Sequence, residues 1–252
     1  MLSRRQFLQF CATAFIATLD NQLLFPMPTS SADGYQKIPV LLYHRIGYTE
    51  NALTVTPERF AADLTYLANA GYQTISLELF TEFVLGREIR LPEKPILITF
   101  DDGYRDNYQN AFPILQQHNM VASFFIITGI FSWEDRMTPS QILEMSRAGM
   151  SIGSHTVSHR PLASLGIDEA RTELQSSKET LENILGKRIA AIAYPQGSFS
   201  QDTVQAAQEM DYDCGFTTLS GHCTKDMPDF ILRRVPVFRY DREVANAMAA
   251  RG

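Results

Sequence analysis

The chain has 252 residues, 45% of them hydrophobic, and a formal net charge of −6 at pH 7. A chain of this size and apolar content can bury a large core, and the sequence contains no repeat, low-complexity linker or shift of composition that would divide it into two domains. The acidic balance argues against nucleic acid or an anionic lipid surface as a partner.

Residues 1–32 have the pattern of a leader. A paired arginine, Arg4 and Arg5, precedes an apolar segment from Phe7 to Leu19 that is too short for a comfortable membrane span. The stretch SRRQFL resembles the twin-arginine export signal. We expect export to the periplasm, the cell surface or the medium; an uncleaved membrane anchor and a chance basic start are the alternatives. Residues 33–252 are then the folded domain.

Strands and helices alternate along the remaining chain. The predicted strands cover residues 38–44, 72–76, 95–100, 121–128, 151–154, 189–194, 214–218 and 231–238. The predicted helices cover residues 57–70, 77–85, 105–118, 139–148, 168–185 and 201–210, with Pro113 bending or splitting the third. Strands separated by helices imply a parallel sheet, and about seven such units favour a distorted (β/α) barrel, a single α/β domain. Functional side chains in such barrels lie at the carboxyl ends of strands.

Two acidic residues end the apolar strand at 95–100. Asp101 and Asp102 follow it directly, and Gly103 allows a sharp turn. Because adjacent strand residues point to opposite sides, we expect the two carboxylates to have different tasks. The alternative is that one caps the next helix while the other is solvated.

Two histidines follow the short strand at 151–154. His155 and His159 lie four residues apart, and on a helical turn both imidazoles could reach one ion. One aspartate and two histidines leave open positions on a divalent metal, as hydrolytic sites require. The alternatives are two surface histidines or a non-haem iron site, although the local His-x-Asp/Glu pair of iron oxygenases is missing.

These motifs carry a family resemblance. TFDDG at 99–103 and SHTVSH at 154–159 are similar to the first two motifs of the polysaccharide deacetylases. The resemblance spans residues 38–240, nearly the whole predicted domain. It implies that Asp101 is the catalytic base. It also implies three metal ligands: Asp102, His155 and His159.

Two further stretches resemble one subgroup, which deacetylates poly-β-1,6-N-acetylglucosamine. PVLLYHRIG looks like the start of that subgroup and implies that His44 is the catalytic acid, although a buried structural histidine is the alternative. AYPQG is similar to the subgroup's third motif and assigns Tyr194, Pro195 and Gln196 to the substrate, with the Gln196 backbone N–H stabilising an oxyanion. We expect a carboxylate beside His44 to raise its pKa, and a cation beside Asp101 to lower that of the base.

The sequence also departs from the family pattern. The third motif usually contains an arginine that supports the base and a final tyrosine, and both are missing here, as are a later Asp-Trp pair and Leu-x-His. Arg234, in ILRRVPV, is the candidate replacement for the arginine, with Arg233 as the alternative.

The predicted function is metal-dependent N-deacetylation of a β-linked N-acetylglucosamine polymer. Zinc is the expected metal, and cobalt or nickel fits the same ligands. The expected partner is the acetylated polysaccharide, and no protein partner can be named. Alternatives are deacetylation of peptidoglycan, deacetylation of another acetylated glycan, and a non-catalytic carbohydrate-binding pseudoenzyme.

Cys214 and Cys223 either pair in an oxidising compartment or stay free.

Overall fold

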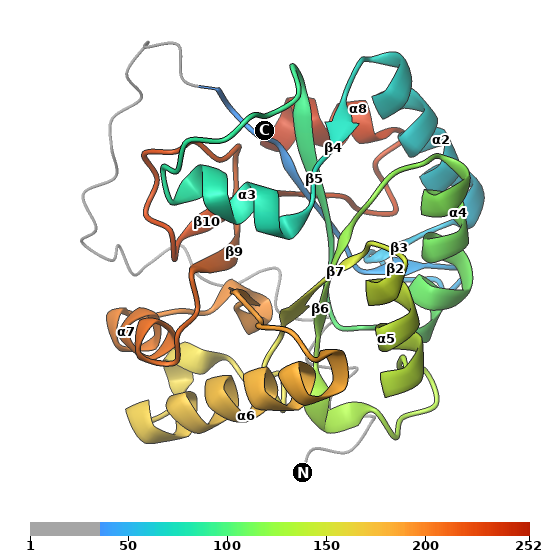
Figure 1. Cartoon of the computed structure of the whole chain (residues 1–252). Helices are drawn as coiled ribbons and strands as arrows, with labels where there is room; N and C mark the ends of the chain where they lie inside the picture. Colours follow the sequence, from blue (N-terminus) through green and yellow to red (C-terminus); the bar gives the residue numbers. More distant parts are fainter. Residues whose placement is uncertain (1–35) are drawn as a thin grey trace.

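The structure is a computed structural model that describes residues 36–252, so the predicted leader lies outside the described residues. Seven parallel strands close into a barrel because β5 pairs with both β6 and β1 (Figure 1). In order around the barrel they are β1 (Val40–Tyr43), β10 (Leu232–Pro236), β9 (Cys214–Ser220), β8 (Ala191–Ala193), β7 (Ser151–Ser154), β6 (Ser123–Ile126) and β5 (Pro95–Phe100). The predicted single-domain α/β barrel of about seven parallel strands is confirmed.

Helices surround the barrel, with α2, α4 and α5 on one side of Figure 1 and α6 and α7 on the other. Their bounds are α2 (Pro57–Asn69), α3 (Leu77–Val84), α4 (Phe112–Gln117), α5 (Pro139–Arg147), α6 (Ile167–Leu185), α7 (Gln201–Glu209) and α8 (Val244–Arg251). The two Thr-Pro starts act as predicted. The Thr56 side chain accepts the Arg59 N–H, and Thr138 forms a capping box with Gln141.

Alternating residues of the strands fill two separate apolar clusters. Leu41 and Ile98 belong to the cluster that also contains residues of α2, α4, α5 and α6, so they face the outer helices. Val40 and Leu97 belong to the other cluster, to which β1, β5, β6, β8, β9 and β10 all contribute. Within the described part of the chain, this second cluster contains no residue of α2, α4, α5, α6 or α7, so it is the barrel interior. Residues of α3 complete it and close one end of the barrel.

Four local features differ from the sequence-based expectation. The helix expected at 105–118 is split close to Pro113, as that proline suggested, but the part before the split is a π-helix at Asn107–Ala111, which was not expected. The short strands β2 (Arg45–Ile46) and β3 (Thr54–Val55), which pair with each other, were not expected. Neither was α8, whose first residue donates its N–H to the buried carboxylate of Asp63 at 2.9 Å. The predicted strand at 72–76 is reduced to β4 (Gln73–Thr74), which pairs with the start of β5.

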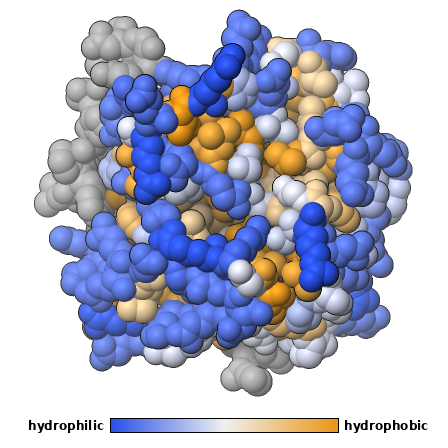
Figure 2. All heavy atoms as spheres, viewed as in Figure 1, coloured by the Kyte–Doolittle hydropathy of each residue, from blue (hydrophilic) through white to orange (hydrophobic). Residues whose placement is uncertain are grey.

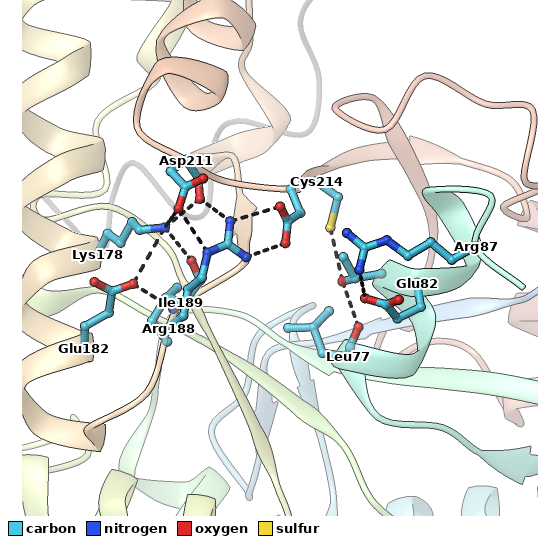
Figure 3. A network of polar contacts seen from close by, with 11 residues as sticks. Leu77, Glu82, Arg87, Lys178, Glu182, Arg188, Ile189, Asp211 and Cys214 are labelled. Atoms are coloured by element: carbon cyan, nitrogen blue, oxygen red, sulfur yellow. Dashed lines mark hydrogen bonds and ion pairs between the residues drawn. The ribbon is translucent and has the colours of Figure 1, made fainter. Parts of the chain in front are cut away.

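A polar network ties α6 to the segments that precede β8 and β9 (Figure 3). Lys178 of α6 donates to the carbonyls of Ile189 and Asp211 at 2.9 and 2.6 Å. Arg188 forms an ion pair with Asp213, next to the start of β9. None of the predicted site residues takes part, so this network serves the packing of α6.

The two cysteines of the described region are buried and free. Burial raises the pKa of each thiol from 9.0 to about 12.

On the face shown in Figure 2 most residues are hydrophilic, and hydrophobic residues gather in the upper half around α3 and β4. Within residues 36–252, no helix combines the length and the hydrophobicity that a membrane crossing needs.

Candidate active site

The turn after β5 brings both aspartates to one place. The Asp101 N–H still donates to the Tyr43 carbonyl, at 3.1 Å, so the strand pairing continues to this residue. Asp102 has a φ of 74° and Gly103 a φ of 67°, so the chain leaves the strand in the left-handed region. Both carboxylates are buried, and His155 Nε2 lies 4.0 Å from Asp101 Oδ2 and 3.4 Å from Asp102 Oδ1. The expectation that they point to opposite sides is wrong because regular strand geometry ends at Asp102.

The two histidines do not lie on a helical turn, as the spacing suggested. They lie in a loop after β7 in which Thr156 and His159 have φ values of 65° and 57°. The His159 N–H donates to the Thr156 hydroxyl at 3.1 Å, and the imidazole centroids are 4.8 Å apart. The predicted proximity is therefore correct, but a loop with two left-handed residues produces it.

A residue that the sequence did not indicate supports this loop. Glu173 of α6 accepts the backbone N–H groups of Val157 and Ser158, both at 2.9 Å. The same carboxylate also accepts the Ser158 hydroxyl at 2.5 Å. Glu173 lies 14 residues after His159 on a polar helix, so no local pattern links it to the site.

The donors of Asp102, His155 and His159 fit a divalent metal ion. One ligand atom from each lies within 4.8 Å of the others, and all three residues are buried. Asp102 Oδ1 is buried without a hydrogen-bond partner and lies 3.4 and 3.2 Å from the Nε2 atoms of His155 and His159. His155 Nδ1 lies 2.7 Å from the Ala193 carbonyl, so Nδ1 carries the proton and the Nε2 lone pair faces Asp102. An unsatisfied carboxylate oxygen facing an imidazole lone pair is the arrangement that a cation stabilises.

Arg234 lies inside the barrel against Asp101. Its two terminal nitrogens donate to the two oxygens of Asp101 at 2.8 and 2.7 Å, and Nε donates to the Thr217 carbonyl at 2.9 Å. Burial raises the pKa of Asp101 and is the largest single influence, but the charge and hydrogen bonds of Arg234, together with His155 and His44, outweigh it, so the pKa lies below the ordinary 3.8. Arg233, the alternative, donates to the Ser220 carbonyl instead.

His44 follows β1 at the same end of the barrel, close enough to Asp101, Asp102 and His155 for their charges to act on it. Burial, helped by the charges of Arg234 and His155, lowers the pKa of His44 below 6.5 and outweighs the opposite effect of the two carboxylates. The two carboxylates therefore act in the expected direction, but the net rise that was expected in this pKa is wrong. A lower pKa makes the imidazolium a stronger acid, although a smaller fraction of the rings carries the proton at neutral pH.

The third predicted segment forms a short turn after β8, η4 (Pro195–Gly197). Gln196 has a φ of 58°, and Gly197 is required because a β-carbon there would lie 2.2 Å from Thr218 Oγ1. The Tyr194 ring is buried and stacks on Phe199 at 5.7 Å, so this side chain packs in the core. A ligand would therefore contact the backbone groups of this segment rather than the Tyr194 ring.

Comparison with known proteins gives this geometry a context. The polysaccharide deacetylase family model matches residues 88–215. The protein YxkH of Bacillus subtilis is 36% identical over 201 residues, which are 80% of this chain and 71% of YxkH. The chain belongs to the polysaccharide deacetylase family. It is thus a member of a family of hydrolases that remove acetyl groups from polysaccharides.

Solved deacetylase structures share the fold. The deacetylase PplD of Streptococcus pyogenes, determined with acetate, superimposes with a TM-score of 0.80 at 30% identity and covers 86% of this chain and 99% of its own. IcaB from Ammonifex degensii has a TM-score of 0.76 at 27% identity and covers 84% of this chain and 97% of its own. Among sequence relatives, the poly-β-1,6-N-acetyl-D-glucosamine N-deacetylase of Staphylococcus epidermidis is 25% identical over 198 residues, 73% of this chain and 68% of that protein.

Proposed function

We propose that this polysaccharide deacetylase is an exported, metal-dependent N-deacetylase of a β-linked N-acetylglucosamine polymer, with poly-β-1,6-N-acetylglucosamine as the favoured substrate. The observation that carries the catalytic part is the paired arrangement of two carboxylates. Asp101 is bound by Arg234, while Asp102 faces His155 and His159. The Arg234 guanidinium thus keeps Asp101 ionised, while Asp102 is one of the three candidate metal ligands.

Asp102, His155 and His159 are the residues that would hold the metal, and zinc is the metal we propose. When bound there, a divalent ion lowers the pKa of a water molecule and polarises the acetyl carbonyl. The export part of the proposal rests on residues 1–32 alone.

The residues of the chain account for the proton transfers. Asp101, ionised beside Arg234, accepts a proton as a water oxygen bonds to the carbonyl carbon of the acetamide. The backbone N–H of Gln196 is the proposed donor to the oxyanion that develops on the carbonyl oxygen. The imidazolium of His44 then gives its proton to the acetamide nitrogen, because an amine leaves far more readily than an amide anion. The C–N bond breaks, and acetate and the sugar amine are released.

The choice of polymer is supported by the relatives and by the place of His44. Poly-β-1,6-N-acetyl-D-glucosamine N-deacetylases recur among the sequence relatives, and His44 follows the first barrel strand, as expected for that subgroup. A second candidate is peptidoglycan. The peptidoglycan-N-acetylmuramic acid deacetylase PdaA of Bacillus subtilis is 32% identical over 155 residues, 60% of this chain and 56% of PdaA.

Acetate release from three glycans side by side tests the proposal. The metal-reconstituted protein is given β-1,6-linked N-acetylglucosamine oligomers, β-1,4-linked oligomers and peptidoglycan. We expect the β-1,6 oligomers to give the highest kcat/KM. Faster release from peptidoglycan would replace the favoured substrate with the second candidate, and binding of a glycan without acetate release from any of them would indicate a pseudoenzyme.

A further inference from the structure

Two aromatic rings stand out on the surface. Tyr48 and Tyr240 are 66% and 67% exposed, more than any other large hydrophobic side chain among residues 36–252. Tyr66, at 41%, is the other exposed tyrosine of the described region, and it lies near the end of α2. Exposed aromatic side chains that cluster beside a site are typical of ligand-contacting surfaces, whereas single ones need no explanation.

Tyr48 and Tyr240 belong to loops that lie side by side at the carboxyl ends of two paired strands. Tyr48 comes four residues after His44, beyond β1, and Tyr240 comes four residues after the end of β10. The Arg239 N–H donates to the Ala52 carbonyl at 2.9 Å, and its guanidinium donates to the Thr49 carbonyl at 3.3 Å. The two loops therefore contact each other at the end of the barrel that carries His44.

Both rings are held in place by buried or charged neighbours. Tyr240 stacks on Phe238 with centroids 5.0 Å apart and an interplanar angle of 20°, and Phe238 is only 5% exposed. One face of Tyr240 is thus covered, and its large exposure belongs to the opposite face and the edge. The Tyr48 hydroxyl donates to the Glu58 carboxylate of α2, which fixes the ring from its polar end. Rings that are already ordered lose little conformational entropy when a ligand stacks on them.

We propose that Tyr48 and Tyr240 form a glycan subsite that binds sugar units next to the unit whose acetamide is hydrolysed. The inference rests on the proposed function, since it needs a polymer that reaches the site beside His44. In a β-linked hexosamine the ring substituents are equatorial, so the axial C–H bonds give each sugar ring apolar faces. Such a face packs flat against an aromatic ring, while the hydroxyl and acetamide groups at its edge stay in water.

This subsite makes the enzyme prefer long substrates over short ones. A disaccharide that places its acetamide beside Asp101 has few units left to reach Tyr48 and Tyr240. A hexamer has enough units to cover both rings. The gain from the subsite therefore appears as an increase of kcat/KM with chain length, because the extra units bind away from the reacting bond.

Binding and chain-length dependence test the subsite separately from turnover. In Asp101→Asn protein, calorimetry measures the affinity for a β-1,6 hexamer with and without Tyr48→Ala and Tyr240→Ala. We expect the two alanines together to weaken binding roughly tenfold or more, the scale of losing buried aromatic contacts. In the active enzyme, the ratio of kcat/KM for hexamer to that for dimer falls by a similar factor.

Two controls separate stacking from folding. Tyr48→Phe and Tyr240→Phe keep the rings, so they retain hexamer affinity within about twofold, and Tyr66→Ala on α2 behaves like the parent. The double alanine variant could keep its thermal unfolding midpoint and still bind hexamer like the parent. That result would overturn the subsite proposal, even if the enzyme releases acetate. Conversely, hexamer binding that depends on both rings supports the subsite even in a protein that releases no acetate, which would overturn only the proposed reaction.

Discussion

Arg234 and Asp101 form a bidentate ion pair inside the barrel, although 133 residues separate them in the chain. Arg234 is fully buried and Asp101 is 2% exposed, so water does not screen the pair. Thr99 and the Thr217 carbonyl also accept hydrogen bonds from the guanidinium, which fixes its plane. A buried carboxylate held in this way stays ionised and keeps one orientation, both of which a general base requires.

Replacing Arg234 by glutamine tests this pairing through the pH dependence of kcat/KM. Without the guanidinium, only His155 and His44 oppose the effect of burial, so the pKa of Asp101 rises. Because the base works only when ionised, activity is lost as the pH falls through its pKa. The acidic limb of the variant therefore moves to higher pH, by about one unit or more.

Arg234→Lys and Arg233→Gln are the matched controls. The lysine keeps a positive charge but cannot form the bidentate pair. The acidic limb of the Arg234→Lys pH profile therefore moves less than that of the Arg234→Gln profile. Arg233 binds the Ser220 carbonyl, and its replacement leaves the limb in place. An Arg234→Gln profile that coincides with the parent profile would contradict the support of Asp101 by Arg234.

The acid role of His44 predicts a dependence on the leaving group. With an N-acetylglucosamine oligomer, His44→Ala lowers kcat by roughly 10²- to 10³-fold, because the amine nitrogen must gain a proton before it departs. With 4-nitrophenyl acetate the phenolate leaves without protonation, so the loss is much smaller. Initial rates on both substrates give the comparison, and equal losses on the two would assign His44 a structural role.

The cysteines are expected to be unreactive in the folded protein. Cys214 and Cys223 are free and buried, and their pKa values of about 12 leave almost no thiolate at pH 8. Iodoacetamide followed by peptide mapping should therefore label neither residue in the native state and both after denaturation. A disulfide-linked peptide containing Cys214 and Cys223, or rapid native labelling, would contradict this assignment.

Much of the barrel could be predicted from the sequence because its signals are local. Apolar runs such as Pro95–Phe100 and the Thr-Pro helix starts depend on near neighbours only, and both appear as expected. The π-helix at Asn107–Ala111 and the docking of α8 onto Asp63 depend on distant packing, and no local pattern indicates them.

For the site, residue types and order carried more information than local geometry. Asp101, Asp102, His155 and His159 meet as the motifs suggested, yet left-handed residues at Asp102 and His159 replace the regular strand and helical turn. Glu173 could not be found because it supports the histidine loop from another element. The pKa of His44 could not be foreseen either, since the extent of its burial decides the sign.

The most direct test of the account compares Asp101→Asn with Asp102→Asn for bound metal and acetate release. Metal content is measured by mass spectrometry after dialysis against zinc, and acetate release is measured on a β-1,6 N-acetylglucosamine oligomer. Asp101→Asn should keep one metal equivalent and lose turnover by at least about 10²-fold, while Asp102→Asn should lose the metal. Asp101→Asn turning over as fast as the parent, or Asp102→Asn holding metal as tightly, would contradict the division of roles between the two acids.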